Sequence, residues 1–132
     1  MFCRLTSLIL FFICPLSSFS APAFLLTHNF TDSDSNAYII TRDGGVIPSI
    51  YPTKSHSTSK VYWNMVKLAC HGHSLGNLCS AMIKMDINSA TPIEIGVVTM
   101  DLITGEILPK TLSAHGYTVT INGLAETTLT RP

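Results

Sequence analysis

Alternation of apolar and polar residues constrains this chain most strongly, and the clearest run lies at positions 81–87. Successive side chains of a β-strand point to opposite faces, so a period of two marks a strand with one buried face. This period predicts a half-buried strand over 81–87. Its apolar face would carry Ala81, Ile83, Met85 and Ile87, and its other face Met82, Lys84 and Asp86.

Shorter runs of the same kind recur along the chain and are separated by turn residues. Asp43-Gly44-Gly45 predicts one hairpin and Asn122-Gly123 predicts another, since both dipeptide types accept the positive φ that tight hairpin turns require. The run 93–102 changes phase beside Gly96, which indicates a β-bulge. Thr104-Gly105 closes a further hairpin, and Pro109 favours an edge strand because proline cannot donate to a ladder.

These patterns together predict an all-β domain of seven or eight short strands with no convincing helix. A small antiparallel β-sandwich fits them best, and a small β-barrel is the second choice. We expect a lead-in strand within 24–36 and a surface loop over 52–60. The segment 60–70 is ambiguous, because its apolar residues also form a helical stripe, but its Val, Tyr and Trp favour a strand.

The first 23 residues have the features of a secretory signal peptide. Arg4 precedes a short apolar run, Leu5 to Leu16, and small residues up to Ala23 follow it. This run is shorter than the ~20 residues that a membrane-spanning helix needs. We therefore expect removal of residues 1–23, no stable membrane insertion afterwards, and a single exported domain over 24–132, either secreted or periplasmic.

Two cysteines remain beyond the signal sequence, Cys70 and Cys79. An even pair in an exported protein predicts a disulfide. The ring that it closes is small, and the chain-entropy model assigns it roughly 2.5–3 kcal/mol of stabilisation. A ring this short is not the inter-sheet bridge of immunoglobulin domains.

The sequence Gly72-His73-Ser74-Leu75-Gly76 resembles the nucleophile elbow of α/β-hydrolase lipases and esterases. The resemblance implies Ser74 as nucleophile, and Asp101 and His115 follow in the family's chain order. It covers five residues, however, and the segments after Ser74 have the pattern of hairpins instead of the crossover helices of that fold. A small secreted serine hydrolase therefore stays as an alternative.

His71 and His73 are two residues apart, so on an extended segment both rings would point to one face and could ligate Zn²⁺ or Cu²⁺. A third ligand could come from His115, His56 or His28. Two polar residues at a hairpin tip are the simpler interpretation, and we expect no metal here.

The segment 32–43 resembles part of an EF-hand calcium loop, with Asp32 and Asp34 at the first and third ligand positions. Ala37 stands where that loop needs glycine, and Asp43 stands where it needs a bidentate glutamate. We expect a solvated turn at this place and no cofactor. Asn29-Phe30-Thr31 is an N-glycosylation sequon.

Charge and motif content favour a binding role over catalysis. Without Arg4, seven basic residues face eight acidic ones, and this balance offers no electrostatic footprint for nucleic acid. The chain shows no phosphate-binding loop, no cofactor motif and no acidic pair suited to glycoside hydrolysis. We predict a binding or interaction module for a protein or glycan ligand, with its surface on the loops 28–36, 52–60 and above all 71–78.

Overall fold

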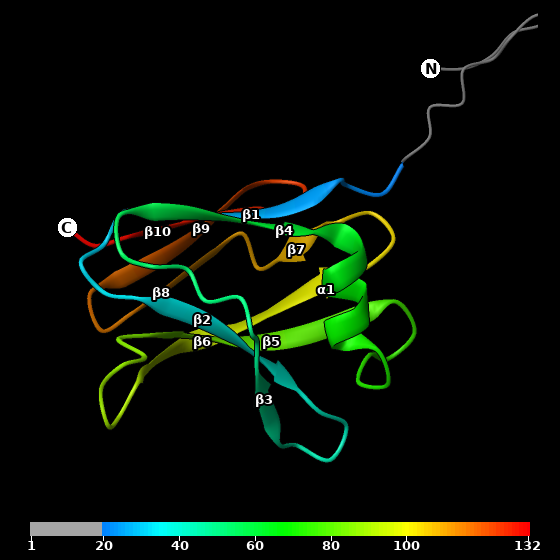
Figure 1. Ribbon diagram of the computed structural model, residues 1–132, viewed down its shortest axis with the longest axis horizontal. Helices are drawn as coiled ribbons and strands as arrows, with labels where there is room; N and C mark the ends of the chain where they lie inside the picture. Colours follow the sequence, from blue (N-terminus) through cyan, green and yellow to red (C-terminus); the bar gives the residue numbers. More distant parts are fainter. Residues whose placement is uncertain (1–19) are drawn as a thin grey trace, which may run out of the picture.

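The computed structural model describes residues 20–132, which form two facing β-sheets with one short helix at their side (Figure 1). The predicted signal peptide falls mostly on residues 1–19, outside this part of the chain. The first sheet has the strand order β4-β1-β10-β9-β8. Its strands are β4 (Ser57–Tyr62), β1 (Phe24–Asn29), β10 (Glu126–Thr130), β9 (Tyr117–Gly123) and β8 (Thr111–Ala114).

The second sheet has the order β3-β2-β5-β6-β7 and is antiparallel throughout. In the first sheet one neighbouring pair, β1 and β10, is parallel. The predicted all-β sandwich is thus confirmed, with ten strands within residues 20–132 where seven or eight were expected. The second sheet consists of β3 (Val46–Pro48), β2 (Ser35–Ile40), β5 (Leu78–Met85), β6 (Ile93–Asp101) and β7 (Ile107–Leu108).

The preference for a strand over 60–70 was wrong for most of that segment. Strand β4 ends at Tyr62, and the helix α1 (Trp63–Cys70) begins at the next residue. Trp63, Val66 and Cys70 are the buried residues of α1 and recur at helical spacing, so they face the sandwich together. None of the helices within residues 20–132 has the length and apolar character needed to span a bilayer.

The predicted β-bulge and the predicted C-terminal hairpin are both present, but the turn of the hairpin is displaced. In the β5–β6 ladder Ile83 pairs with Gly96 and Lys84 with Glu94, so the expected bulge lies beside Gly96. The β9–β10 hairpin also exists, but Leu124 and Ala125 form its turn instead of Asn122-Gly123. Buried Ala125 fixes the tip there, because its N–H donates to the Gly105 carbonyl at 2.8 Å and its carbonyl accepts from the Leu26 N–H at 2.9 Å.

The core lies between the sheets and continues under α1. Its largest cluster joins β5 and β6 to β9 and β10 and includes Met85, Ile95, Val119 and Leu129. A second cluster, with Trp63 and Val66, attaches α1 to Val61 of β4. The indole Nε1 of Trp63 also donates to the Leu102 carbonyl at 3.0 Å, which ties the helix to the β6–β7 turn.

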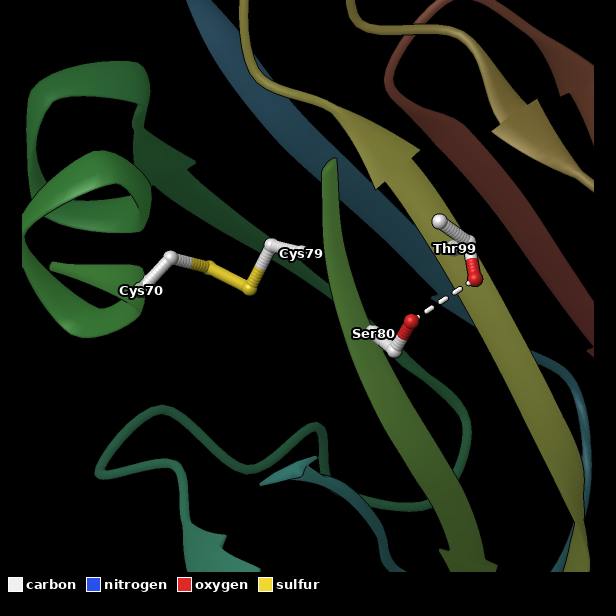
Figure 2. The surroundings of a disulfide bond; sticks show 4 residues. All are labelled: Cys70, Cys79, Ser80 and Thr99. Carbon is white, nitrogen blue, oxygen red and sulfur yellow. Dashed lines mark hydrogen bonds between the residues drawn. A yellow bond between two sulfur atoms is a disulfide. The ribbon is translucent and has the colours of Figure 1, made fainter. Parts of the chain in front are cut away.

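The predicted disulfide joins Cys70 and Cys79, whose Cα atoms lie 6.0 Å apart. Figure 2 shows it running from the last residue of α1 to the inner face of β5, while the Ser80 hydroxyl bonds to Thr99 on the adjacent strand β6. Both cysteines are buried, and they pack with Ile39 and Ala81. The bond therefore holds the end of the helix against the second sheet.

Replacing Trp63 by Phe should reduce the free energy of unfolding by about 2 kcal/mol, because it removes the donor to Leu102 and opens a small gap. Urea denaturation followed by far-UV circular dichroism measures this change. Tryptophan fluorescence is unsuitable, because the variant lacks Trp63, the only tryptophan of the sequence. Tyr62→Phe is the control. Tyr62 is 68% exposed, so its loss of a hydroxyl should change stability by less than about 0.5 kcal/mol.

The double variant Cys70→Ala/Cys79→Ala should lose about 3 kcal/mol of unfolding free energy and much of the hydrogen-exchange protection of α1. Leu75→Ala alters the same ring at a position 71% exposed and should stay within about 0.5 kcal/mol of wild type. A loss below about 1 kcal/mol in the double variant would show that the helix keeps its place without the bond.

Candidate functional site

The segment 71–78, which the sequence ranked first as a binding loop, is a compact ring closed by the disulfide. The His73 N–H donates to the Cys70 carbonyl at 2.9 Å, and Leu75 and Leu78 exchange backbone hydrogen bonds at 2.9 and 3.0 Å. Gly72 and Gly76 have φ values of 84° and 62°, a left-handed conformation that glycine adopts without strain. Both glycines therefore serve the turns that close the ring.

Of the three residues of the hydrolase alternative, Asp101 lies near the ring, since it pairs with Leu78, while His115 lies in a separate turn. The Asp101 carboxylate accepts hydrogen bonds from the backbone N–H groups of Ile103 at 2.8 Å and Thr104 at 3.1 Å, so it caps the β6–β7 turn. His115 occupies the β8–β9 turn with a φ of 54°. This turn lies beside Arg131, at the end of the first sheet opposite to the one where β4 leads into α1.

Ser74 lacks the surroundings of a nucleophile elbow. Its carbonyl accepts a hydrogen bond from the Arg42 guanidinium at 2.9 Å, and the strand β5 follows where the hydrolase family has a helix. The fold thus places Ser74 on the ring, Asp101 in one turn and His115 in another, with no hydrogen bond joining their side chains among residues 20–132.

The histidines considered as metal ligands are also dispersed. His71 and His73 lie on the ring, and residues 20–132 contain no group of three or more His, Cys, Asp or Glu side chains placed to hold a metal ion. The His28 Nε2 lies 2.7 Å from a Glu126 carboxylate oxygen, and its Nδ1 lies 3.0 Å from the Thr58 hydroxyl. His56 pairs with Asp32 at 2.6 Å.

The calcium-like segment begins as a loop, which hydrogen bonds from Ser55 and Asn88 stabilise, and continues as the strand β2 from Ser35 onward. The Asp34 carboxylate accepts from the Ser55 backbone N–H at 2.9 Å and from the Asn88 amide at 2.8 Å. These two bonds, the first being the stronger cause, lower the pKa of Asp34 below its ordinary value of 3.8, and the positive charge of Lys54 adds to the effect. Asn36, further along the segment, takes no part in this network, since its amide donates to the Ser49 carbonyl.

Asn29 of the sequon is buried in the folded chain, with 1% of its surface exposed. Its amide nitrogen donates to the carbonyls of Ser33 at 2.8 Å and Thr53 at 3.3 Å, and its oxygen accepts from Thr31. An oligosaccharide on this nitrogen would replace one of its two donating hydrogens, and the buried position leaves no space for the sugar. In the folded protein Asn29 is therefore a structural residue.

The feature that sequence reasoning missed is a cavity of about 120 Å³ between the two sheets. Both sheets, α1 and the segment 49–53 line it, and the buried disulfide forms part of its wall. No Asp, Glu, Lys, Arg or His side chain lies among its lining residues. Small residues at inward positions of the second sheet, Ala37 of β2 and Ala81 of β5, leave much of this space.

The cavity approaches the surface between α1 and the segment that links β3 to β4. Met65 and Ala69, which line it from the helix, are both solvent-exposed, and half-buried Ser49 and Tyr51 line it from the opposite side. The disulfide fixes the C-terminal end of α1, so the helical side of this cavity edge is held in place.

The lowered pKa of Asp34 predicts a contribution to stability that is present above the pKa of the unfolded chain and is lost as the pH falls through the folded value. We therefore expect the unfolding free energy of the wild type to fall more steeply than that of Asp34→Asn between pH 5 and pH 2. Urea titrations at a series of pH values measure the two slopes. Asp86→Asn removes a neighbouring carboxylate outside this hydrogen-bond network and should keep the wild-type slope.

Comparison with known proteins places the chain in a family. The family model described as the type II secretion system (T2SS) substrate NttC matches residues 1–132. The crystal structure of the Legionella pneumophila type II secretion system substrate NttC has a TM-score of 0.80 and 55% sequence identity, and the match covers 85% of this chain and 100% of that chain. No curated protein gives a significant match. The chain therefore belongs to the NttC family of type II secretion substrates, and its predicted export is confirmed.

Proposed function

We propose that this secreted protein is a binding protein that holds a small, largely apolar ligand between its two sheets. The observation that carries the proposal is the cavity of about 120 Å³ beside the disulfide. Well-packed protein interiors contain few voids larger than a water molecule, so a space of this size in a small domain calls for an explanation. A ligand site supplies one.

The size and chemistry of the cavity restrict the ligand. An apolar cavity of about 150 Å³ engineered into another protein stays dry and binds benzene. The present cavity is slightly smaller and lacks charged lining residues, so it suits a molecule of about six to eight non-hydrogen atoms. At a ceiling of about −1.5 kcal/mol per non-hydrogen atom, a ligand of this size reaches at most about −9 to −12 kcal/mol, so its affinity cannot exceed the nanomolar range.

This site differs from the surface that the sequence indicated. The predicted protein or glycan partner would use exposed loops, whereas a largely apolar cavity between two sheets favours a small molecule taken out of water. The ring 71–78 then has a supporting role, since its disulfide holds α1 beside the cavity. Binding would therefore depend on the disulfide, which holds α1 in place. It would not depend on His71 or His73, because neither residue lines the cavity.

Ala81→Leu should abolish binding by filling the cavity. Ala81 is 8% exposed and lines the space from the middle of β5. The larger side chain would occupy volume that is empty, so the unfolding free energy should change by less than about 1.5 kcal/mol. Isothermal titration calorimetry or ligand-observed NMR with toluene measures binding, and we expect at least a tenfold loss of affinity.

Met82→Leu is the matched control, because the next residue on β5 does not line the cavity. It should bind toluene like the wild type. Equal toluene binding by Ala81→Leu and the wild type, or failure of the wild type to bind toluene and each of the oxygen-containing probes used below, would show that the cavity is not a ligand site.

A further inference from the structure

A row of four hydroxyl groups crosses the interior of the first sheet and lines one part of the cavity. It comprises Thr127 of β10, Thr27 of β1, Ser59 of β4 and Thr53 of the neighbouring segment. Thr27 lies opposite Thr127 on one side and opposite Ser59 on the other. Thr53 continues the row, since its hydroxyl lies 2.8 Å from that of Ser59.

The hydrogen bonds within this row leave donors free. Thr127 donates to the Thr27 hydroxyl over a long 3.4 Å, and one of Thr53 and Ser59 donates to the other. Four hydroxyls carry four protons, and these two bonds use two of them. Within residues 20–132, the Thr27 proton and one proton of the Thr53–Ser59 pair have no other side-chain or backbone acceptor, and these side chains line the cavity.

Most of the remaining wall of the cavity is apolar, and its other polar residues are Ser35, Asn36, Ser49 and Tyr51. Leu25, Val61, Ala81, Val98 and Met100 surround the space next to the hydroxyl row. A ligand that fills it would therefore place an apolar body against these side chains and one polar atom against the row. Because no charged side chain lines the cavity, an ionised head group would be buried without a counter-charge, at a cost of several kcal/mol.

We propose that the ligand is a neutral molecule with one hydroxyl or carbonyl oxygen on an apolar body, such as a monocyclic phenol or a five- to seven-carbon alcohol or ketone. This inference rests on the proposed function and specifies its ligand class. The ligand oxygen accepts the free proton of Thr27, and the proton left on the Thr53–Ser59 pair is a second donor for its other lone pair. A hydrocarbon of the same shape fills the space but leaves both donors unused.

The experiment compares toluene with p-cresol, which differs from it by one hydroxyl, in the wild type and in Thr27→Val/Thr127→Val. Valine keeps the shape of threonine and removes the hydroxyl. We expect p-cresol affinity to fall at least tenfold in the double variant, while toluene affinity stays within threefold of wild type. NMR titration gives both constants and locates the perturbed backbone amides.

Ser80→Ala/Thr99→Val is the matched control, because it removes a hydrogen-bonded hydroxyl pair from the other face of the second sheet (Figure 2). It should leave both affinities unchanged. Wild type alone gives a second test, in which 1-hexanol should bind at least tenfold more tightly than hexanoate at pH 7.

The outcomes separate the two proposals. Equal changes of toluene and p-cresol affinity in the double variant would overturn the inferred ligand class and leave the cavity as a hydrocarbon site. Tighter binding of hexanoate than of hexanol would also overturn that class, because the preferred ligand would then be an anion. Failure of all four probes to bind the wild type would overturn both proposals together.

Discussion

The disulfide between Cys70 and Cys79 is the constraint on which the cavity side of this fold depends. Isolated helices shorter than ~12–15 residues are marginal in water, and α1 has eight residues. Its Tyr62 cap makes no side-chain hydrogen bond. The helix therefore persists through tertiary contacts, with Trp63 and Val66 packed at one end and the disulfide at the other. With both ends held, α1 covers the edge of the sandwich where the two sheets would otherwise open to solvent.

Local pattern was enough to predict the sheets but not the features that tertiary contacts decide. The alternation over 81–87, the Asp43-Gly44-Gly45 turn and the bulge beside Gly96 all follow from the two-residue period and from glycine's tolerance of unusual φ. The helix was missed because a strand preference at Val61 and Tyr62 holds only until β4 ends. The turn near Asn122 moved because burial of Ala125 outweighs the local preference of Asn-Gly. Cysteine pairing was predictable from export and count alone.

The cavity left a weaker trace in the sequence. On β1, β4 and β10 the inward positions read Leu25-Thr27-Asn29, Ser57-Ser59-Val61 and Thr127-Leu129, so a hydroxyl stands where a sandwich core usually has a β-branched apolar residue. Each strand alone gives no reason to single out its Ser or Thr. Only the register, which sets Thr27 between Ser59 and Thr127, turns three unremarkable residues into one polar row. Functional sites are expected where several neighbouring residues depart together from the pattern that the fold would otherwise favour.

An empty space of this size has an energetic consequence that the disulfide balances. A cavity of about 120 Å³ costs about 3 kcal/mol at roughly 24 cal/mol per Å³. Closure of the Cys70–Cys79 ring contributes roughly 2.5–3 kcal/mol in the opposite direction. The two terms are equal within their precision, and the bond lies in the wall of the cavity itself. The disulfide, which forms in the oxidising environment outside the cytosol, thus offsets the packing energy that the cavity loses. A secreted domain can therefore keep a ligand-sized cavity at little net loss of stability.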